Sequence, residues 1–588
     1  MEIHGFLATR LRGLGRSLIL ASVAVGLAAG SAGAATAPSI PFTRSTTKVK
    51  SLGRVSLLHA PTISMDEPTR LREAPTQNSS FQRFISGTVK SARVPSSGVP
   101  TPAGSGLSAV SGGFGFDALN DVDQGFASGF VLEPPDQGLT VGGGLVLEAI
   151  NSAFTFFDPA TGDNLFGPGN AIPLSFFDAS LDPTDPRCYY DADTGQWFVT
   201  YLGLGSHDFI VIAVSAPGDP LDYAVYEIDT TNDGTNGTPT HDGCPCFGDQ
   251  PLIGADAYAF YVSTNEFGDS FNGAQIYAID KAAIESGALD PNIVLFSPGS
   301  LEEGIAYSVQ PASVPPGGSY DLSNGGTQYF LSALDFFNTL DNRVAAWAMT
   351  GSSNISTDPS LLALQEQTIP SEVYGAPPSN QQKTGPLPLR DALADGYFAP
   401  FYDKEHEELV QSNDDRMNQV VFADGLLWSG LNTVVKTKNG PTRTGIAYFA
   451  VSPNFPDAGS FEPSVTSQGY IAVNNQSAIF PSIGVNAEGQ GAVSFSVVGP
   501  GLYPGAAWAT IDAVNGVGPL MLAAPGAAPD DGFTGYSAFG GNRVARWGDY
   551  SAAVSDENGD IWLATEYIPD RERFIYANWG TFVSKVTP

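Results

Sequence analysis

Acidic and arginine side chains recur at equivalent places along the chain, and they are the residues best suited to carry chemistry. Each stands directly before a short apolar stretch of a repeated unit. The guanidinium of an arginine offers a rigid fork of donors that suits a carboxylate or a phosphate. A tyrosine beside a carboxylate can act as a nucleophile or as a general acid or base. The candidates are Asp136, Arg187, Asp249, Gln310, Arg416, Ser482, Arg546, Asp549 and Tyr550.

The strongest of these candidates stand close together near the C-terminus. Arg546, Asp549 and Tyr550 stand within five residues of one another, in the sequence Arg-Trp-Gly-Asp-Tyr. Its glycine, Gly548, lets another group approach the backbone closely. In a catalytic site, Tyr550, Asp549 and Asp249 are predicted to react, while Arg546, Arg416, Arg187 and Asp136 are predicted to bind the substrate.

A structural interpretation competes with the catalytic one. Acids and arginines at equivalent places of neighbouring repeats can pair with each other and with backbone amides, because buried polar groups must be satisfied whatever the function. In that case the same residues hold the repeats together and bind nothing else.

The elements that position these residues are strands, and one β-rich unit recurs from about residue 130. In its clearest copy, Asp185–Arg187 precedes the first strand and a turn follows at Asp191–Gly195. Strands follow at Trp197–Tyr201 and Ile210–Val214. Similar units begin near Pro135, Asp249, Val309, Asp415, Phe480 and Arg546, which makes seven.

A repeated unit of this kind cannot bury both of its faces alone, so the copies must pack on one another. The sequence therefore predicts an all-β chain with a single β-propeller of about seven four-stranded blades over residues 126–588, with six or eight as alternatives. We expect a strand near residue 130 to close the ring against Thr581–Val586, and residues 366–412 to form a surface insertion. Separate β-sandwich domains are the alternative, but Pro-rich linkers between units are missing.

The N-terminal region predicts export. Residues 1–34 combine a basic start, the short apolar run Leu18–Ala29 and the small-residue sequence Ala32-Gly33-Ala34. This is the pattern of a secretory signal peptide, and the apolar run is too short for a membrane anchor. Residues 35–125 are rich in Ser, Pro and Gly, and basic up to residue 100; we expect a mostly disordered leader.

The charge of the chain limits its partners. Among 588 residues, 61 Asp and Glu outnumber 27 Lys and Arg, although residues 1–100 are basic. So acidic a domain repels phosphate backbones and anionic membranes, which excludes nucleic acid as a partner. We expect no cofactor. Calcium is the one ion that the acid excess would suit, although a solvated acidic surface explains the charge more simply.

Three cysteines follow the signal: Cys188, Cys244 and Cys246. In an oxidising compartment this count gives one disulfide and one spare thiol, and we predict a bridge from Cys188 to Cys244 or Cys246. A zinc site would need a fourth ligand, for which His241 is the local candidate.

One local motif carries a resemblance to a known superfamily. The stretch Ser555–Trp562 resembles the Asp-box turn of sialidase-like propellers, which reads Ser-x-Asp-x-Gly-x-Thr-Trp. Ser555, Gly559 and Trp562 match, whereas Glu557 replaces the Asp and Ile561 the Thr. The box is a structural turn, so the resemblance implies the fold.

The repeated phrases as a whole resemble a group of uncharacterised secreted bacterial propellers over about residues 130–588. The phrases are Cys246–Pro251, Asp414–Met417, Leu431–Thr433 and Arg546–Tyr550. Resemblance to true sialidases would imply that Arg187, Arg416 and Arg546 hold a substrate carboxylate and that Tyr550 is the nucleophile. No Glu of this chain matches the partner that the sialidase tyrosine uses.

Two functions follow from the fold class. The first is an extracellular module that binds carbohydrate or a surface partner at the mouth of the central channel. The second is a carbohydrate-active enzyme, a sialidase-like glycoside hydrolase or a polysaccharide lyase. Aromatic residues at turns, which we expect to be exposed, suit either function; Trp197 and Trp562 are examples. An enzyme predicts a deep pocket with acids of shifted pKa, and a binding module predicts a shallow mouth.

Overall fold

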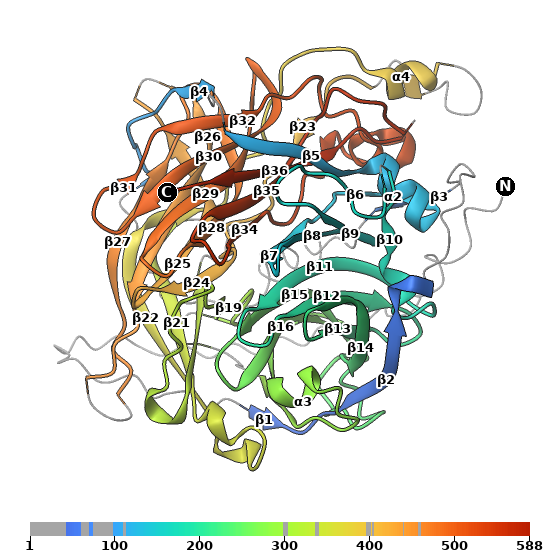
Figure 1. Ribbon diagram of the computed structural model, residues 1–588. Coiled ribbons are helices and arrows are strands. Elements are labelled where there is room, and N and C mark those ends of the chain that lie inside the picture. Colours follow the sequence, from blue (N-terminus) through green and yellow to red (C-terminus); the bar gives the residue numbers. More distant parts are fainter. Residues whose placement is uncertain are drawn as a thin grey trace, which may run out of the picture. The chain divides into compact units, whose positions relative to one another are not determined.

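The computed structural model describes most of the chain after the N-terminal region. The described residues are 43–59, 70–73, 98–109, 113–167, 169–297, 301, 304–334, 340–394, 401–402, 405–438, 440–456, 460–574 and 576–588. The predicted signal peptide, residues 1–34, lies outside them. Most regular elements in this part of the chain are β-strands, so the all-β prediction is confirmed (Figure 1).

The strands form antiparallel sets of four in chain order. In the first set, β7 (Gly138–Gly142), β8 (Leu145–Ile150), β9 (Ala153–Phe157) and β10 (Ile172–Pro173) pair one after another. The next sets are β11 (Asp182–Asp191), β12 (Gln196–Leu204), β13 (Phe209–Ala216) and β14 (Asp219–Asp229); β15 (Phe247–Ala255), β16 (Ala259–Phe267), β17 (Phe271–Asp280) and β18 (Ile293–Ser297); and β19 (Gln310–Ser313), β20 (Thr327–Ala333), β21 (Leu340–Thr350) and β22 (Ala363–Gly375).

The C-terminal sets repeat this order. They are β24 (Val420–Ala423), β25 (Leu426–Lys436), β26 (Thr442–Ser452) and β27 (Ser464–Ile471); β28 (Ser477–Val485), β29 (Gln490–Gly499), β30 (Leu502–Asp512) and β32 (Leu520–Ala524); and β34 (Ala552–Ser555), β35 (Ile561–Tyr567) and β36 (Gly580–Val586), with β5 (Phe114–Asn120) as the fourth strand. Short helices, α2 (Asp121–Ser128), α3 (Lys281–Glu285) and α4 (Pro388–Ala392), lie between strands.

The first strands of the sets contact one another in a closed cycle. The order is β7, β11, β15, β19, β24, β28, β34 and back to β7, and these inner strands surround a common centre in Figure 1. Between β19 and β24 the contact is a short parallel pairing, which joins two sets into one sheet of eight strands. A cyclic order of inner strands is the arrangement that the propeller prediction requires.

Aromatic side chains fill the space between neighbouring sets. Phe198 on β12 stacks on Phe260 of β16 with ring centroids 4.9 Å apart, and Tyr261 meets Phe330 of β20 edge to face at 5.7 Å. Because both faces of each sheet are covered, second strands such as β12, β16, β20 and β35 are buried along nearly their whole length. Trp197 and Trp562 are only 2% and 1% exposed, so they are core residues and not exposed aromatics as expected.

Strands from the predicted leader pair with the outer edges of the sheets. Its composition predicts disorder over residues 35–125, but β1 (Thr43–Ser45) pairs with β18 and β2 (Val49–Ser56) with β14. A third strand, β4 (Leu107–Ala109), runs parallel to β32. Basic residues of the leader form ion pairs with acids of the sheet. Lys50 and Arg54 of β2 pair with Glu227 and Asp222 of β14, at 2.9 Å each.

The ring is closed by β5, and not by a strand near residue 130 as expected. Antiparallel pairing joins β5 to β36, the last strand of the chain. The strand near residue 130, β6 (Phe130–Glu133), instead pairs in parallel with β3 (Arg70–Glu73). Closure of the last set by an N-terminal strand covers the edge of β36.

Parts of residues 366–412, the predicted surface insertion, pair with strands of the sheets. The first ten belong to β22, the outer strand of its set. Of the rest, Leu389 and Val410 are buried, and β23 (Leu409–Val410) pairs with β33 (Val544–Ala545) just before the last set. The apolar side chains of this Pro-rich stretch therefore pack on the body of the protein.

Among the described residues, no helix combines the length and the apolar character needed to cross a membrane.

The closing strand should contribute measurably to stability. A chain that begins at residue 113 keeps β5, and one that begins at residue 121 lacks it. Loss of the buried side chains Ala118 and Leu119, together with the exposed edge of β36, should lower the free energy of unfolding by at least about 2 kcal/mol. Thermal unfolding and size-exclusion chromatography of the pair would measure this. Equal melting temperatures and equal monodispersity would contradict the role of β5.

Candidate functional site

Each inner strand contains, or is preceded by, a residue in the left-handed backbone region. For residues other than glycine this conformation is strained, and such strain is retained where the surroundings fix it. In β11, β15 and β28 the residue coincides with a shift of register to the second strand. The residues, with φ between 44° and 54°, are Asp136, Asp185, Gln250, Ser308, Asn413, Phe480 and Gly548. The repeats therefore share a kink at the place that the sequence singled out.

Three aspartates from three inner-strand starts lie together. One carboxylate oxygen each of Asp136, Asp185 and Asp549 lies within 4.8 Å of the others, and all three residues are buried. The backbone N–H of Asp549 donates to Asp136 Oδ1 at 2.6 Å. Asn151 donates to Asp136 Oδ2 at 2.7 Å and accepts the backbone N–H of Asp185 at 2.7 Å. Asp185 belongs to this aspartate triad, although the sequence analysis did not select it as a candidate.

The predicted arginines lie around the triad in different ways. Arg546 pairs with Asp549 at 3.0 Å. Arg416 donates to both oxygens of Asp414, at 2.7 and 2.6 Å, and to Gln250 Oε1 at 2.6 Å. The guanidinium groups of Arg416 and Arg546 thus contact carboxylate and amide oxygens of the chain itself. These are the contacts that the structural interpretation expects.

Arg187 and Tyr550 form a stacked pair. The guanidinium carbon of Arg187 lies 3.2 Å from the centre of the Tyr550 ring, a cation–π contact between the second and the last set. The Tyr550 hydroxyl donates to the carbonyl oxygen of Pro186 at 2.8 Å. The Nε and Nη2 atoms of Arg187 are buried and have no hydrogen-bond partner in the described part of the chain.

Asp249 is the least satisfied carboxylate of the group. It is 1% exposed, and neither of its oxygens has a hydrogen-bond partner among the described residues. Burial, together with the charges of Asp185 and Asp549, raises its pKa well above the usual range, although Arg416 opposes the shift. Burial and Asp549 likewise raise the pKa of Asp136, and burial raises that of Asp185 to about 6.

More buried acids extend this group, and the sequence analysis did not select them. Burial raises the pKa of Glu133 and of Glu566 well above the usual range, with the charge of Asp530 as the next cause for both. The pKa of Asp530 rises to about 7 for the same first reason. Glu566 stands in the apolar strand β35, and an acid inside a buried strand is the signal that could have found it.

Gln310 and Ser482 do not join the acids and arginines. Gln310 donates to the carbonyl oxygen of Met417 at 3.3 Å, and Ser482 donates to the side-chain oxygen of Gln419 at 2.9 Å. Both side chains therefore hold neighbouring repeats together, as the structural interpretation expects.

A narrow cavity lies between the inner strands. Residues of β7, β11, β15, β19 and β34 line it, and Gln419 completes its wall before β24. Arg187 is one of the lining residues, so the cavity reaches the group of acids and arginines. Arg187 is the one charged residue among those that line the cavity.

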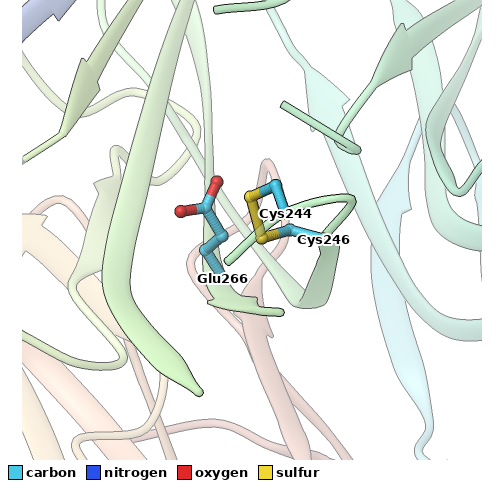
Figure 2. A group of neighbouring side chains, drawn as sticks. All are labelled: Cys244, Cys246 and Glu266. Atoms are coloured by element: carbon cyan, nitrogen blue, oxygen red, sulfur yellow. A yellow bond between two sulfur atoms is a disulfide. The ribbon is translucent and has the colours of Figure 1, made fainter. Parts of the chain in front are cut away.

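The predicted disulfide is wrong in its partners. Cys244 bonds to Cys246, two residues away (Figure 2). Cys188, on β11, is a free thiol. Burial raises the pKa of that thiol. The two bonded cysteines lie in one loop between β14 and β15. The disulfide therefore closes a short loop and not the long one predicted from Cys188. Cysteines in a disulfide are not thiolates, and the zinc alternative does not apply to this oxidised state.

The turn that resembles an Asp-box is structural. Asp556 accepts hydrogen bonds from the backbone N–H groups of Asn558 and Asp560 and from the indole N–H of Trp562, at 2.8, 3.1 and 2.9 Å. Gly559 adopts a positive φ of 82°, which the turn requires. The motif thus fixes the hairpin between β34 and β35 and takes no part in the site.

No protein-family model and no curated protein sequence matches the chain. Several solved structures match large parts of the chain at low identity and low TM-score. A subtype N10 neuraminidase-like protein of A/little yellow-shouldered bat/Guatemala is 9% identical over 62% of this chain and 90% of its own, with a TM-score of 0.30. Polysaccharide lyase Uly1 is 8% identical over 78% and 99%, with a TM-score of 0.33. The α-L-arabinanase of Penicillium chrysogenum is 11% identical over 69% and 93%, with a TM-score of 0.25.

The buried acids predict an unusual dependence of stability on pH. Carboxyl groups of the unfolded chain release their protons near pH 4, whereas Asp185 and Asp530 release theirs at about 6 and 7 in the folded chain. Between these values the folded state binds more protons, so its stability falls as pH rises. With a chelator present, each group should lower the free energy of unfolding by about 1.4 kcal/mol per pH unit above pH 5, until the pH reaches the pKa of that group in the folded chain.

Urea unfolding at pH 5, 6, 7 and 8 with EDTA present measures this slope. An unchanged or rising free energy of unfolding over this range would show that the buried acids stay ionised in the folded protein.

Proposed function

We propose that this chain is a secreted protein built on one seven-bladed β-propeller, and that it binds an extracellular polar ligand where the inner strands begin. The ligand class is a carbohydrate or a polar surface of a partner protein. The N-terminal signal pattern supports export. The cyclic contacts of the inner strands, and closure of the last set by β5, support a single ring of seven blades.

The observation that carries ligand binding is the pair of unsatisfied side chains at this end of the ring. Within the described part of the chain, Arg187 has two buried N–H donors without hydrogen-bond partners, and Asp249 has two buried acceptor oxygens without them. Each unmade hydrogen bond of a buried group is unfavourable by roughly 1–3 kcal/mol, so native proteins rarely leave such groups without a partner. A ligand with hydroxyl or carboxylate groups supplies acceptors for Arg187 and donors for Asp249. Sugars, and acidic sugars above all, carry both.

The alternative within this proposal is a carbohydrate-active enzyme, a sialidase-like glycoside hydrolase or a polysaccharide lyase. One observation favours it: Asp249, whose pKa is raised, lies in the same group as Asp549, whose charge is held by Arg546. Acid–base catalysis needs two carboxyl groups in different surroundings, one of them with a raised pKa. Binding is favoured because the Tyr550 hydroxyl is engaged by a backbone carbonyl and its ring by Arg187.

Calcium belongs to the same proposal. Six buried aspartates, the triad with Asp249, Asp414 and Asp415, face three arginines at this end of the ring, which leaves an excess of negative charge. The oxygens of the triad approach within 4.8 Å, and carboxylate oxygens are the ligands that calcium prefers. A bound cation would keep these carboxylates ionised without a net buried charge.

Calcium should therefore stabilise the protein more at pH 8 than at pH 5, because protons compete for the same carboxylates at low pH. Asp136→Asn keeps the shape of the side chain and removes one ligand charge, so it should abolish most of the calcium effect. Differential scanning fluorimetry at both pH values, with calcium or EDTA, measures this. Asp242→Asn, at an exposed loop position, is the control. A calcium effect that is equal in the Asp136→Asn variant would remove the ion from this place.

The ligand is tested by isothermal titration of the full chain with acidic and neutral oligosaccharides. Arg187→Lys keeps the charge but loses the fork of donors, so affinity for an acidic sugar should fall at least 10-fold. Arg54 stands on β2, which pairs with the outer strand β14, so Arg54→Lys should leave the affinity for the sugar unchanged. Release of product from the same sugars would select the enzyme. If no sugar binds the folded wild-type protein, the carbohydrate ligand is excluded and a protein partner remains.

A further inference from the structure

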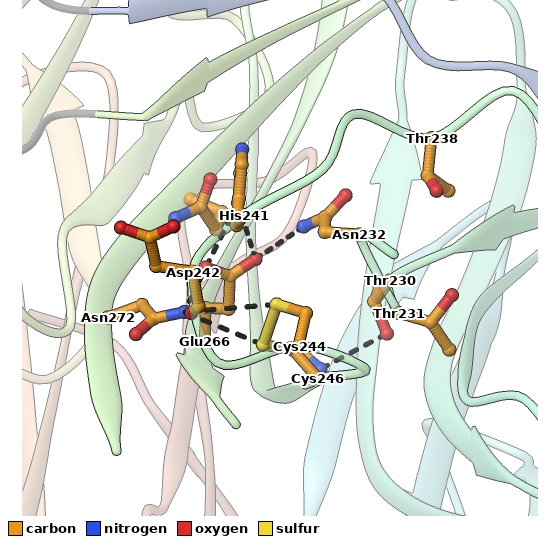
Figure 3. The surroundings of a disulfide bond; sticks show 12 residues. Thr230, Thr231, Asn232, Thr238, His241, Asp242, Cys244, Cys246, Glu266 and Asn272 are labelled. Atoms are coloured by element: carbon orange, nitrogen blue, oxygen red, sulfur yellow. Dashed lines mark hydrogen bonds and ion pairs between the residues drawn. A yellow bond between two sulfur atoms is a disulfide. The ribbon is translucent and has the colours of Figure 1, made fainter. Parts of the chain in front are cut away.

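Two cysteines and a glutamate meet beside the start of β15, and a histidine contacts the glutamate. One ligand atom each of Cys244, Cys246 and Glu266 lies within 4.8 Å of the others (Figure 2). His241 holds its Nδ1 atom 2.9 and 3.0 Å from the two oxygens of Glu266 (Figure 3). Both sulfurs are at present joined in a disulfide.

The disulfide contributes little to the stability of the chain. It closes a loop of three residues, and the entropy that a cross-link removes from the unfolded chain grows with the size of its loop. The loop is also tied down without it. The backbone N–H of Cys246 donates to the carbonyl oxygen of Thr231 at 2.8 Å, and that of Asp269 donates to the carbonyl oxygen of Gly243 at 2.9 Å. The cysteines can therefore be reduced while the loop keeps its place.

A reductant can reach this bond. Cys244 is partly exposed, and its neighbours Asp242 and Gly243 are exposed, although Cys246 is buried. Thiol–disulfide exchange begins with attack of a thiolate on one accessible sulfur, and Cys244 offers that sulfur.

Glu266 is held in place for a ligand role. It is 1% exposed on β16, and its carboxylate accepts hydrogen bonds from Asn232, His241 and Asn272 (Figure 3). Asn272 also lies 3.5 Å from Cys246 Sγ and 3.8 Å from Cys244 Sγ. Such outer contacts orient first-coordination ligands in known metal sites.

We propose that reduction of the Cys244–Cys246 disulfide turns this place into a binding site for a thiophilic divalent cation of the zinc class. A dithiol delivers two electrons and two protons to the disulfide and leaves as a cyclic disulfide. The cation then displaces both thiol protons and takes two thiolates, the Glu266 carboxylate and the His241 imidazole. Two sulfurs, one oxygen and one nitrogen are donors that zinc accepts in a tetrahedral arrangement, and the thiolates select against calcium.

The oxidised protein cannot form this site, because a disulfide sulfur is not a thiolate. Cation binding therefore depends on the redox state of the two cysteines. It does not depend on the ligand proposed for the end of the ring. It is separate from the aspartate triad, whose oxygen donors suit a different ion.

Cobalt(II) gives a direct test with the full-length protein. The chain is treated with dithiothreitol, freed of it under nitrogen, and titrated with Co²⁺ beside an untreated sample. Thiol counts after denaturation should rise from one to three per chain. We expect one equivalent of Co²⁺ to produce sulfur-to-cobalt charge-transfer absorption and the visible bands of a tetrahedral ion, and one equivalent of Zn²⁺ to remove them. The untreated protein should give neither.

Matched variants locate the ion. Cys244→Ser and Cys246→Ser should each lose the charge-transfer absorption, and Glu266→Gln should bind Co²⁺ at least 10-fold more weakly. Cys188→Ser should bind like the wild type, because its thiol is elsewhere. Three results would each overturn the proposal: a reduced, folded wild-type chain that gives no cobalt spectrum, a spectrum that depends on Cys188, or a disulfide that stays intact in the folded protein.

Discussion

The pairing of β5 with β36 is the contact on which the rest of the structure depends. It joins a strand that precedes the repeats to the last strand of the chain, and so brings the first and the last set side by side. Only then can the backbone of Asp549 donate to the carboxylate of Asp136, across 413 residues of sequence. The stack of Arg187 on Tyr550 joins the last set to the second one as well. Closure of the ring and assembly of the candidate site are therefore one event.

Closure also creates an electrostatic problem. Inner strands that converge on one centre bring their starting residues into a small buried volume, and six buried aspartates are among those residues. The three arginines offset part of the charge, and Arg416 and Arg546 are already engaged by Asp414 and Asp549. The remaining carboxylates can bind protons, a cation or the donors of a ligand. The competition among these three links the pH, calcium and sugar dependence of the protein.

The loop before β15 places a second chemistry near the first. Cys246 precedes Asp249 by three residues, and β15 pairs with β16 so that Gly248 lies opposite Glu266. The sulfur donors of the cysteines and the oxygen donors of Asp249 thus lie close together at the start of β15.

The sequence by itself determined what depends on local pattern. Apolar runs between turns predicted the second and third strands, such as Trp197–Tyr201 within β12, because strand formation follows the spacing of neighbouring residues. The recurrence of the unit also selected Asp136, Arg187, Asp249, Arg416, Arg546, Asp549 and Tyr550, which the structure gathers at one end of the ring.

Contacts between distant residues were decided only by the tertiary structure. Asp185 and Glu566 became members of the site because burial and neighbouring acids surround them, which no local spacing reveals. The leader strands β1 and β2 formed because open sheet edges offered them backbone partners. The disulfide joined Cys244 to Cys246 because the fold left Cys188 in another sheet. Local propensity fixes the strands, whereas long-range closure fixes which side chains meet.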